Sequence, residues 1–435
     1  MRKHVCILII MIICQYNYGQ ENTLIYQEIS SKGININDGQ IINVKINNWS
    51  KNDEFVVQFD GINIIAKKTR LIDRGINGYG LWAVDRANSN NIIYLSLFNK
   101  NISGFINIGD EKYTVNTSKN GQYLISKVDN NITIENKSDM VYINDKSSAI
   151  PQKSNSTETH KLIRMLVLYT PDAGTSQYVM ERTLNAIDIT NAVLENSVNN
   201  SNLKAKVELV YVGATSYSGA TDESAILSLF MNPNDNQMDE VHHLRNIVQA
   251  DVCVLFTDLG WGTAGIAYTG LGHNVGATED YAFMVVSPGY IDSYYVFAHE
   301  LGHIVGCKHN HAIDVDTLNF QTVMAEYARS NTIPYFSNPN KTYNGVQLGD
   351  ELVRNSAKVW NNNYNNVINF RIVPDMLNVT AAPISSSSYY QYRANESINA
   401  SGINIPIDKT VSMRSKAITF QNGFLVNGQL ELTSE

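Results

Sequence analysis

The feature that most constrains this chain is the stretch FAHELGHIVGCKHNH, residues 297–311, which holds four of the nine histidines in 435 residues. His299 and His303 are four residues apart, so a helix here would place both imidazoles on one face, one turn apart. Two imidazoles in that arrangement can bind one divalent ion. We therefore predict a helix from Tyr290 to Val305 that supplies two ligands of a metal site.

The predicted third ligand is His309. A catalytic zinc ion takes three protein ligands and keeps a fourth position open, so the chain must reverse after the helix to bring another side chain to the metal. Gly306 stands where a helix end needs a residue in the left-handed conformation. His311 competes for the same role, but the spacing from Gly306 favours His309.

Glu300, directly after the first histidine, is the predicted general base. Its carboxylate can reach the water at the metal without being a ligand. Zinc lowers the pKa of bound water to about 7 and polarises a carbonyl group, so Glu300 can accept the proton as the water attacks. The pattern predicts peptide-bond hydrolysis by a metal-activated water, with one catalytic zinc ion (Zn2+). Calcium binding is left open by the sequence.

The N-terminal residues predict export. A basic start precedes the apolar run VCILIIMIIC, which is typical of a secretory signal peptide over residues 1–20. No later segment approaches 18 uninterrupted apolar residues, so we expect no membrane span and a secreted, extracellular protein. Cleavage there would leave Cys253 and Cys307 as the remaining thiols, and their pairing in a disulfide is left open.

The composition and the spacing of apolar residues change several times along the rest of the chain. Residues 21–147 hold short alternating apolar stretches between turn residues, which predicts a β-rich domain of hairpins. A polar linker follows at 148–160, an exposed place for a protease to cut. From 161 to 375 buried strands alternate with amphipathic helices, which predicts an α/β (α+β) domain with a helix-backed mixed sheet. A Ser-rich linker, 376–396, leads to a small all-β stack at 397–435.

These features resemble the metzincins, a clan of zinc endopeptidases defined by the extended histidine motif and a downstream methionine turn. Met324 in QTVMAEY stands fifteen residues after His309, where that clan places its turn beneath the zinc ligands. The reprolysin-like branch fits best, because ADVCVLFTD, GIAY and IPYFSNP occur in the expected order. The chain also resembles bacterial peptidyl-Asp metalloendopeptidases. The resemblance covers about residues 160–372.

The resemblance also implies how a substrate would bind. TAGIAYTG would lie near the edge strand on which an extended peptide pairs its backbone. Residues from Ala325 to Phe336 would form the wall of the pocket just after the scissile bond, with Tyr327 and Arg329 as its candidate pocket residues. An inward Arg329 would favour an acidic substrate residue, whereas an outward one would be solvated.

The β-rich N-terminal domain resembles the propeptide of such proteases, which implies a zymogen. The chain has no cysteine between Cys14 and Cys253, so a cysteine latch on the zinc is not available. Inhibition by an oxygen ligand and simple occlusion of the cleft are the two remaining alternatives. The last 40 residues resemble short C-terminal repeat modules of secreted bacterial proteins, which would serve cell-surface sorting or attachment.

The sequence therefore predicts a secreted zinc metalloendopeptidase with peptide or protein substrates. A surface adhesin or binding protein on a protease-like scaffold, with a non-catalytic zinc, is the alternative. Glu300 counts against that alternative, because a structural zinc site has no use for an unligated carboxylate beside an open position. The net charge of -8 argues against a nucleic-acid partner.

Overall fold

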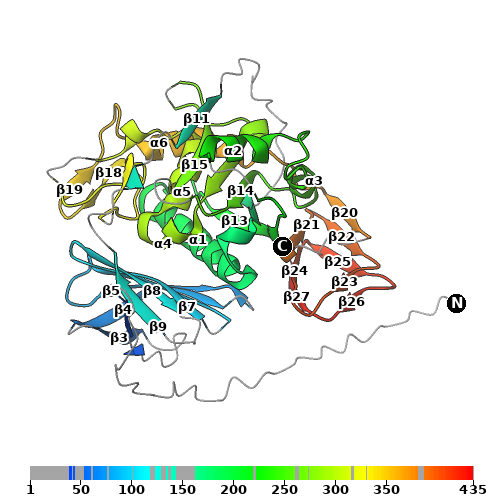
Figure 1. The fold of residues 1–435 in the computed structure, drawn as a ribbon, viewed down its shortest axis with the longest axis horizontal. Coiled ribbons are helices and arrows are strands. Elements are labelled where there is room, and N and C mark those ends of the chain that lie inside the picture. Colours follow the sequence, from blue (N-terminus) through cyan, green and yellow to red (C-terminus); the bar gives the residue numbers. More distant parts are fainter. Residues whose placement is uncertain are drawn as a thin grey trace.

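The structure is a computed structural model with three parts, which Figure 1 shows side by side. An N-terminal sheet lies beside a central domain of helices and strands, and a stack of short strands forms the C-terminal part. The predicted signal peptide, 1–20, and the predicted linker, 148–160, lie outside the described residues. The structure describes residues 39–434 apart from 42, 45–52, 60–61, 76–77, 100, 118–122, 129–133, 136–138, 144–161, 219–221, 260–263, 273, 315–317, 330 and 381–386.

The N-terminal part is an antiparallel sheet in which most consecutive strands are neighbours. This is the hairpin arrangement that the alternating apolar stretches predict. Side chains alternate between its two faces, so Ile93 and Leu95 pack in the core of the sheet itself, whereas Tyr94 and Phe105 pack against the central domain. Its described strands are β1 (Gly39–Ile41), β2 (Asn43–Val44), β3 (Glu54–Phe59), β4 (Ile62–Asp73), β5 (Tyr79–Asp85), β6 (Ile92–Phe98), β7 (Asn101–Ile108), β8 (Glu111–Thr117) and β9 (Tyr123–Lys127).

The central domain is built on a sheet whose strands are buried on both faces. Its strands are β12 (Ile163–Tyr169), β13 (Val207–Ala214), β14 (Val252–Phe256), β15 (Gly265–Gly270) and β16 (Phe283–Val286). Its helices are α1 (Ser176–Ser197), α2 (Glu223–Met231), α3 (Glu240–Ile247), α4 (Ile291–Tyr294), α5 (Val296–Val305) and α6 (Ser356–Val367). Shorter strands complete it: β10 (Ile134–Glu135), β11 (Met140–Ile143), β17 (Tyr327–Ala328), β18 (Asn338–Tyr343) and β19 (Val346–Leu348).

The predicted helix-backed mixed sheet is confirmed. Strand β12 pairs in parallel with β13 and β14, and β14 pairs in parallel with β16. Strand β15 is antiparallel to β16, so the sheet is mixed. Parallel strands covered on both faces read as continuous apolar runs, which is why LIRMLVLYT and DVCVLFTD stand out in the sequence. Within the described part of the chain, none of the helices combines the length and apolar character that crossing a bilayer requires.

The prediction of one helix from Tyr290 to Val305 is wrong in its first turn. Helix α4 ends at Tyr294, and Tyr295 adopts a left-handed conformation with φ of 58° before α5 begins. The fully buried ring of Tyr295 packs edge-on against Phe105 of the N-terminal sheet, with ring centroids 5.8 Å apart. A contact with a distant sheet thus interrupts the helix, and no local pattern could reveal it.

The boundaries of the C-terminal stack also differ from the prediction. Range 376–396, predicted as a linker, contains β20 (Met376–Val379) and β21 (Ser387–Arg393). Strand β21 pairs antiparallel with β13, so the stack continues the central sheet. Tyr390 of β21 packs against Tyr211 of β13, with ring centroids 5.5 Å apart. The later strands are β22 (Ser397–Ala400), β23 (Asn404–Ile405), β24 (Thr410–Arg414), β25 (Ala417–Phe420), β26 (Leu425–Val426) and β27 (Gln429–Thr433).

Candidate metal centre

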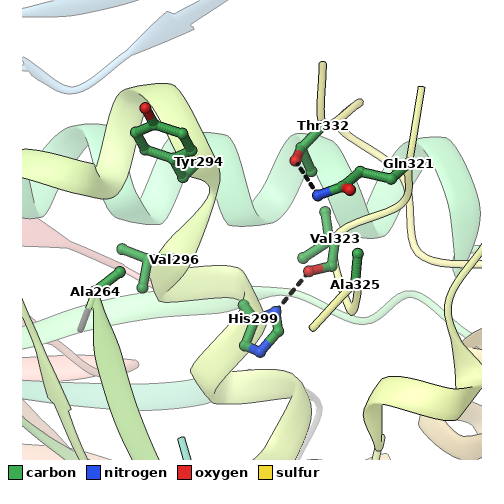
Figure 2. A pocket seen from close by; sticks show the side chains of 8 residues that line it. All are labelled: Ala264, Tyr294, Val296, His299, Gln321, Val323, Ala325 and Thr332. Atoms are coloured by element: carbon green, nitrogen blue, oxygen red, sulfur yellow. Dashed lines mark hydrogen bonds between the residues drawn. The ribbon is translucent and has the colours of Figure 1, made fainter. Parts of the chain in front are cut away.

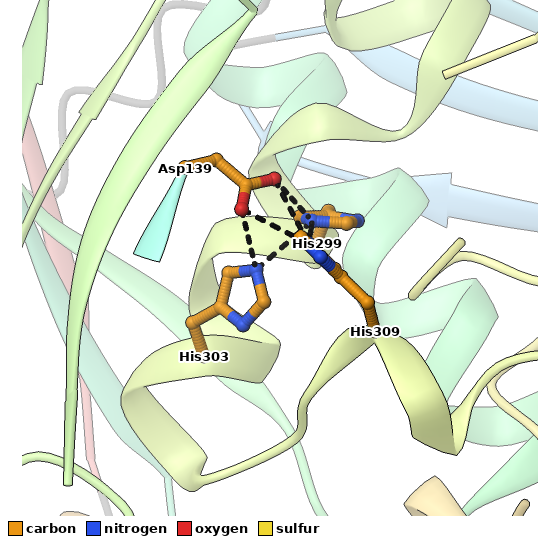
Figure 3. A group of neighbouring side chains, drawn as sticks. All are labelled: Asp139, His299, His303 and His309. Atoms are coloured by element: carbon orange, nitrogen blue, oxygen red, sulfur yellow. Dashed lines mark hydrogen bonds and ion pairs between the residues drawn. The ribbon is translucent and has the colours of Figure 1, made fainter. Parts of the chain in front are cut away.

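Three predicted ligands converge at one point, as Figure 3 shows. His299 and His303 lie one turn apart on α5, with their Nε2 atoms 3.0 Å from each other. Gly306 ends α5 in a left-handed conformation with φ of 111°, and the chain reverses there. His309 then begins a short 3-10 helix, and its Nε2 lies 3.3 Å from that of His299. His311 is not part of this group, because its Nδ1 accepts a hydrogen bond from the backbone N–H of Lys308.

Asp139 is the fourth member of the group, and it comes from the N-terminal side of the chain. Its Oδ2 lies 2.9 Å from Nε2 of His299, and its Oδ1 lies 2.9 Å from Nε2 of His309 and 3.5 Å from that of His303. No sequence pattern identifies this residue. An oxygen ligand was one of the two predicted alternatives for inhibition, but Asp139 is 160 residues from His299, and no spacing rule connects them.

The geometry of these four side chains fits a zinc ion. Their ligand atoms all lie within 4.8 Å of one another. Zinc–ligand bonds of 2.0–2.2 Å in a tetrahedron separate the ligand atoms by about 3.3 Å. The separations between the Nε2 and carboxylate atoms, 2.9–3.5 Å, bracket that value. Histidine nitrogen and carboxylate oxygen are both ordinary zinc ligands.

Backbone carbonyls orient two of the imidazoles. Nδ1 of His299 lies 2.6 Å from the carbonyl oxygen of Val323, and Nδ1 of His303 lies 2.9 Å from that of Cys307. Since a carbonyl only accepts, each Nδ1 carries the proton, and each Nε2 presents its lone pair to the centre. Burial lowers the pKa of His303 to about 3, which keeps this imidazole neutral, as a metal ligand must be.

Asp139 is ionised in this arrangement. Burial by itself would raise the pKa of its carboxyl group, but the contacts with His303, His299 and His309 outweigh burial and hold that pKa well below its usual range. A buried carboxylate among three imidazoles is a binding environment for a cation.

Met324 lies directly beneath the ligand-bearing helix. Its side chain is fully buried, and a Cβ atom added to Gly302 of α5 would stand 2.4 Å from the Met324 Sδ. The absence of a side chain at Gly302 therefore lets the methionine pack against α5, one residue before His303.

Glu300 is fully buried and lies against strand β15. A Cβ atom at Gly265 would stand 2.6 Å from Oε1 of Glu300, so the strand has a glycine where the carboxyl group passes. Among the described residues, neither carboxyl oxygen of Glu300 has a hydrogen-bond partner. Burial, followed by the charge of Asp139, raises the pKa of Glu300 well above its usual range. A buried carboxyl group without a partner is expensive to maintain and is typical of functional sites.

Two described strands flank Asp139 in the sequence. Strand β10 pairs antiparallel with β17, and β11 pairs in parallel with β15. Asp139 directly precedes β11 and lies among the three imidazoles. Strand β11 therefore lies along β15 in the way an added peptide strand would.

The two candidate pocket residues are partly exposed. Tyr327 belongs to β17 and faces Glu135 in the strand pairing. Arg329 forms an ion pair with Asp314 at 3.8 Å, and its side chain is 35% exposed. Neither lines the cavity beside His299 that Figure 2 shows. Cys253 and Cys307 are both buried free thiols, so they do not form a disulfide.

Comparison with known proteins agrees with this geometry. A peptidyl-Asp metalloendopeptidase of Xanthomonas campestris pv. campestris is 32% identical over 224 residues, which is 48% of this chain and 52% of that protein. One from Stenotrophomonas maltophilia is 30% identical over 235 residues, 50% of this chain and 54% of that protein. The chain thus spans about half the length of the curated relatives it matches.

A solved structure and a family model also match. The crystal structure of metalloproteinase-II from Bacteroides fragilis covers 65% of this chain and 88% of that chain, with 13% identity and a TM-score of 0.43. The model of Metallo-peptidase family M12 matches residues 159–345, which hold the three histidines, Glu300 and Met324. Residues 159–345 are therefore similar to Metallo-peptidase family M12.

Proposed function

We propose that this protein is a secreted zinc endopeptidase that is synthesised as an inactive proenzyme. The observation that carries the proposal is the convergence of three imidazole Nε2 atoms beside a buried carboxyl group, Glu300, within an M12 domain. The names of the relatives support hydrolysis of peptide bonds. Export is supported by the signal-peptide pattern of residues 1–20.

In this proposal His299, His303 and His309 hold the zinc ion, which supplies Lewis acidity toward a carbonyl group and toward water when it is bound. Glu300 takes a proton from the attacking water and passes it to the leaving amine. Strand β15 orients the substrate by pairing with its backbone, as it pairs with β11 in this structure. Met324 and the carbonyls of Val323 and Cys307 keep the imidazoles in place.

Latency in this proposal comes from Asp139. Its carboxylate takes the fourth position around the three imidazoles, and its flanking strands cover both sides of the cleft. A substrate needs the same position and the same edge strand, so it cannot bind while Asp139 and β11 are in place. The predicted linker at 148–160, which contains Lys153, is where an activating protease would separate the segment from the domain.

The position of Asp139 among the three imidazoles also favours a second candidate function. Four protein ligands complete a tetrahedral site, which is the usual form of a structural zinc. With Asp139 permanently in place, the protein would be a binding protein on a protease-like scaffold. The two candidates differ in whether removal of Asp139 exposes a hydrolytic site.

The experiment uses the full-length chain, because β21 pairs with β13 and a fragment ending at 375 would lack that strand. The Asp139→Ala variant is cut with immobilised trypsin, which is then removed, and casein hydrolysis is measured with and without a chelator. We expect hydrolysis that the chelator abolishes. Adding Glu300→Gln should lower the rate about 10²- to 10⁴-fold with zinc content unchanged. Stoichiometric zinc without any hydrolysis would favour the binding protein.

A further inference from the structure

The ammonium group of Lys308 is buried at the end of strand β15. Lys308 directly precedes His309, and the whole residue is 7% exposed. Its Nζ donates hydrogen bonds to Oγ1 of Thr269, to the carbonyl oxygen of Gly270 at 2.9 Å and to that of Val275 at 3.4 Å. An ammonium group has three hydrogens, so these three acceptors use them all. The positive charge of Lys308 is therefore held at a fixed point beside the edge strand.

An aromatic ring lies over this charge. Tyr142 of β11 faces Thr269 in the pairing with β15, and its ring centroid is 5.1 Å from Nζ of Lys308. A cation within about 6 Å of a ring centroid is attracted by the negative face of the ring. Tyr142 is 46% exposed, so the charge and the strand pairing, rather than a surrounding core, hold this ring in place.

Tyr142 stands where a side chain of an added peptide strand would stand. The backbone N–H of Ala267 in β15 donates to the carbonyl oxygen of Asp139 at 2.9 Å. Tyr142 then faces Thr269, two residues further along β15. A peptide that replaces β11 pairs with the same edge strand, so one of its side chains comes to lie over Lys308 in the place of the Tyr142 ring.

The two ends of β15 lie on different sides of the metal group. Ala264, which precedes β15, lines the same small cavity as Ala325, from the segment predicted to lie just after the cleaved bond. Asp139 pairs with the middle of the strand, and Thr269 lies near its far end. Two residues along a strand span roughly 7 Å. The place beside Lys308 therefore takes a substrate side chain about two or three residues before the cleaved bond.

The hydrogen bonds of the ammonium group decide which side chain fits. A carboxylate needs an N–H donor, and the three hydrogens of Lys308 already have acceptors. A ring face needs only the charge, because its attraction to a cation is electrostatic. Apolar surface is also present after β15, where Leu271 is 60% exposed and Val275 is 47% exposed. An aromatic side chain is therefore favoured by both the charge and the apolar surface.

Resting on the proposed function, we infer that Lys308 binds an aromatic side chain of the substrate, two or three residues before the cleaved bond, through a cation–π contact. Tyr142 occupies this place while β11 is present, and the substrate ring takes it after β11 has left. Lys308 then has two roles. Its three hydrogen bonds hold the end of β15, and its charge selects the substrate.

The test uses the full-length Asp139→Ala protein after trypsin treatment and removal of the trypsin, and it needs no substitution at Lys308. Peptides carry phenylalanine, pentafluorophenylalanine, leucine or glutamate at the second or third position before the cut. Fluorination reverses the charge distribution of the ring and leaves its shape nearly unchanged. At one of these positions kcat/KM should be about 2- to 5-fold higher for phenylalanine than for the other three. Apolar packing alone would place pentafluorophenylalanine level with phenylalanine or above it.

Variants then assign the preference to its residue. Lys308→Arg keeps a cation and should keep the preference, whereas Lys308→Met should make the phenylalanine and pentafluorophenylalanine peptides equal. Lys358→Met makes the same change at an exposed lysine of α6 and should leave the preference unchanged. The quantity compared is the ratio between peptides within one variant, which a general loss of activity does not alter. Zinc content shows whether each variant keeps its metal site.

Binding without cleavage separates this inference from the proposed function. The same peptides are titrated calorimetrically into Asp139→Ala protein that also carries Glu300→Gln, and Kd should be about 2- to 5-fold lower for phenylalanine than for pentafluorophenylalanine. Equal values, or a preference that Lys308→Met leaves intact, would overturn the inference even if the peptides are cleaved. The predicted binding preference without cleavage of any peptide by zinc-loaded Asp139→Ala protein would support the ring site and overturn the proposed function.

Discussion

At the scale of single residues, glycines make room for the groups that act. Gly265 leaves space for the Glu300 carboxyl group, and Gly302 leaves space for Met324. Each glycine is therefore needed because a side chain from another element occupies the space that a Cβ atom would take. The spacing of the histidines can be read from the sequence alone, because four residues make about one turn of helix. The unpaired amide oxygen of Gln321 cannot, because the two partners that hold its amide nitrogen, Tyr327 and Thr332, come together only on folding.

We predict that Gly302→Ala destabilises the protein by about 1–3 kcal/mol, the usual cost of overpacking a filled core. The new methyl group would stand 2.4 Å from the Met324 sulfur, so either α5 or the turn must move. Urea unfolding measures the change, and zinc affinity should fall with it. Gly289→Ala is the matched control, because a Cβ atom there meets nothing within 4 Å. Equal stability of the two variants would contradict the packing argument.

At the scale of elements, the central sheet extends into the C-terminal stack. Strands β21, β24 and β27 continue the sheet beyond β13, so the stack and the central domain share a hydrogen-bonded ladder. The Ser-rich sequence of this region suggested a linker. Its buried tyrosines, Tyr389, Tyr390 and Tyr392, fill the space between the two parts instead. Tyrosines in a polar stretch are ambiguous until their packing partners are known.

We predict that Tyr390→Ala lowers the stability of the central domain itself, by about 3–5 kcal/mol, as expected for deleting a fully buried aromatic ring. Loss of secondary structure and loss of bound zinc should occur at the same urea concentration, which is lower than for the parent protein. Phe420→Ala removes a ring from the same stack that is 40% exposed, and it should cost far less. Separate transitions for zinc loss and for unfolding of the stack would refute this coupling.

At the scale of the whole molecule, the N-terminal sheet docks through buried polar contacts. Arg74 of this sheet forms a buried ion pair with Asp188 of α1. Lys112 of β8 is 1% exposed, and its Nζ donates to the carbonyl oxygen of Ser293 at 2.5 Å and lies 4.4 Å from the Tyr295 ring centroid. A dissociable partner has to leave behind a surface that water can solvate, and polar contacts provide one.

We predict that docking of the N-terminal sheet strengthens as pH rises from 7 to 9. Burial lowers the pKa of Lys112 to about 7, against an ordinary value of 10.5 when it is released. The docked state therefore binds fewer protons than the released state in this pH range. The contribution of Lys112 to docking is largest above pH 10.5, and it decreases as the pH falls toward 7. The change is at most about tenfold in affinity per pH unit.

The measurement is retention of the N-terminal fragment by the central domain after the predicted linker, 148–160, has been cut. Lys112→Met keeps most of the buried volume and removes the titrating group, so its retention should vary much less between pH 7 and 9. A pH dependence identical to that of the parent protein would assign the effect to another group.

The sequence by itself determined the local parts of this protein. Helical periodicity placed His299, His303 and Glu300 on one helix, Gly306 marked its end, and apolar runs marked the buried strands. These features depend on neighbours within a few residues, where backbone geometry limits the choices. The tertiary structure alone decided the rest: the break at Tyr295, β21 in the central sheet, and Asp139 among the imidazoles. Each of these joins residues far apart in the chain, and such contacts are selected by packing and burial over the whole fold.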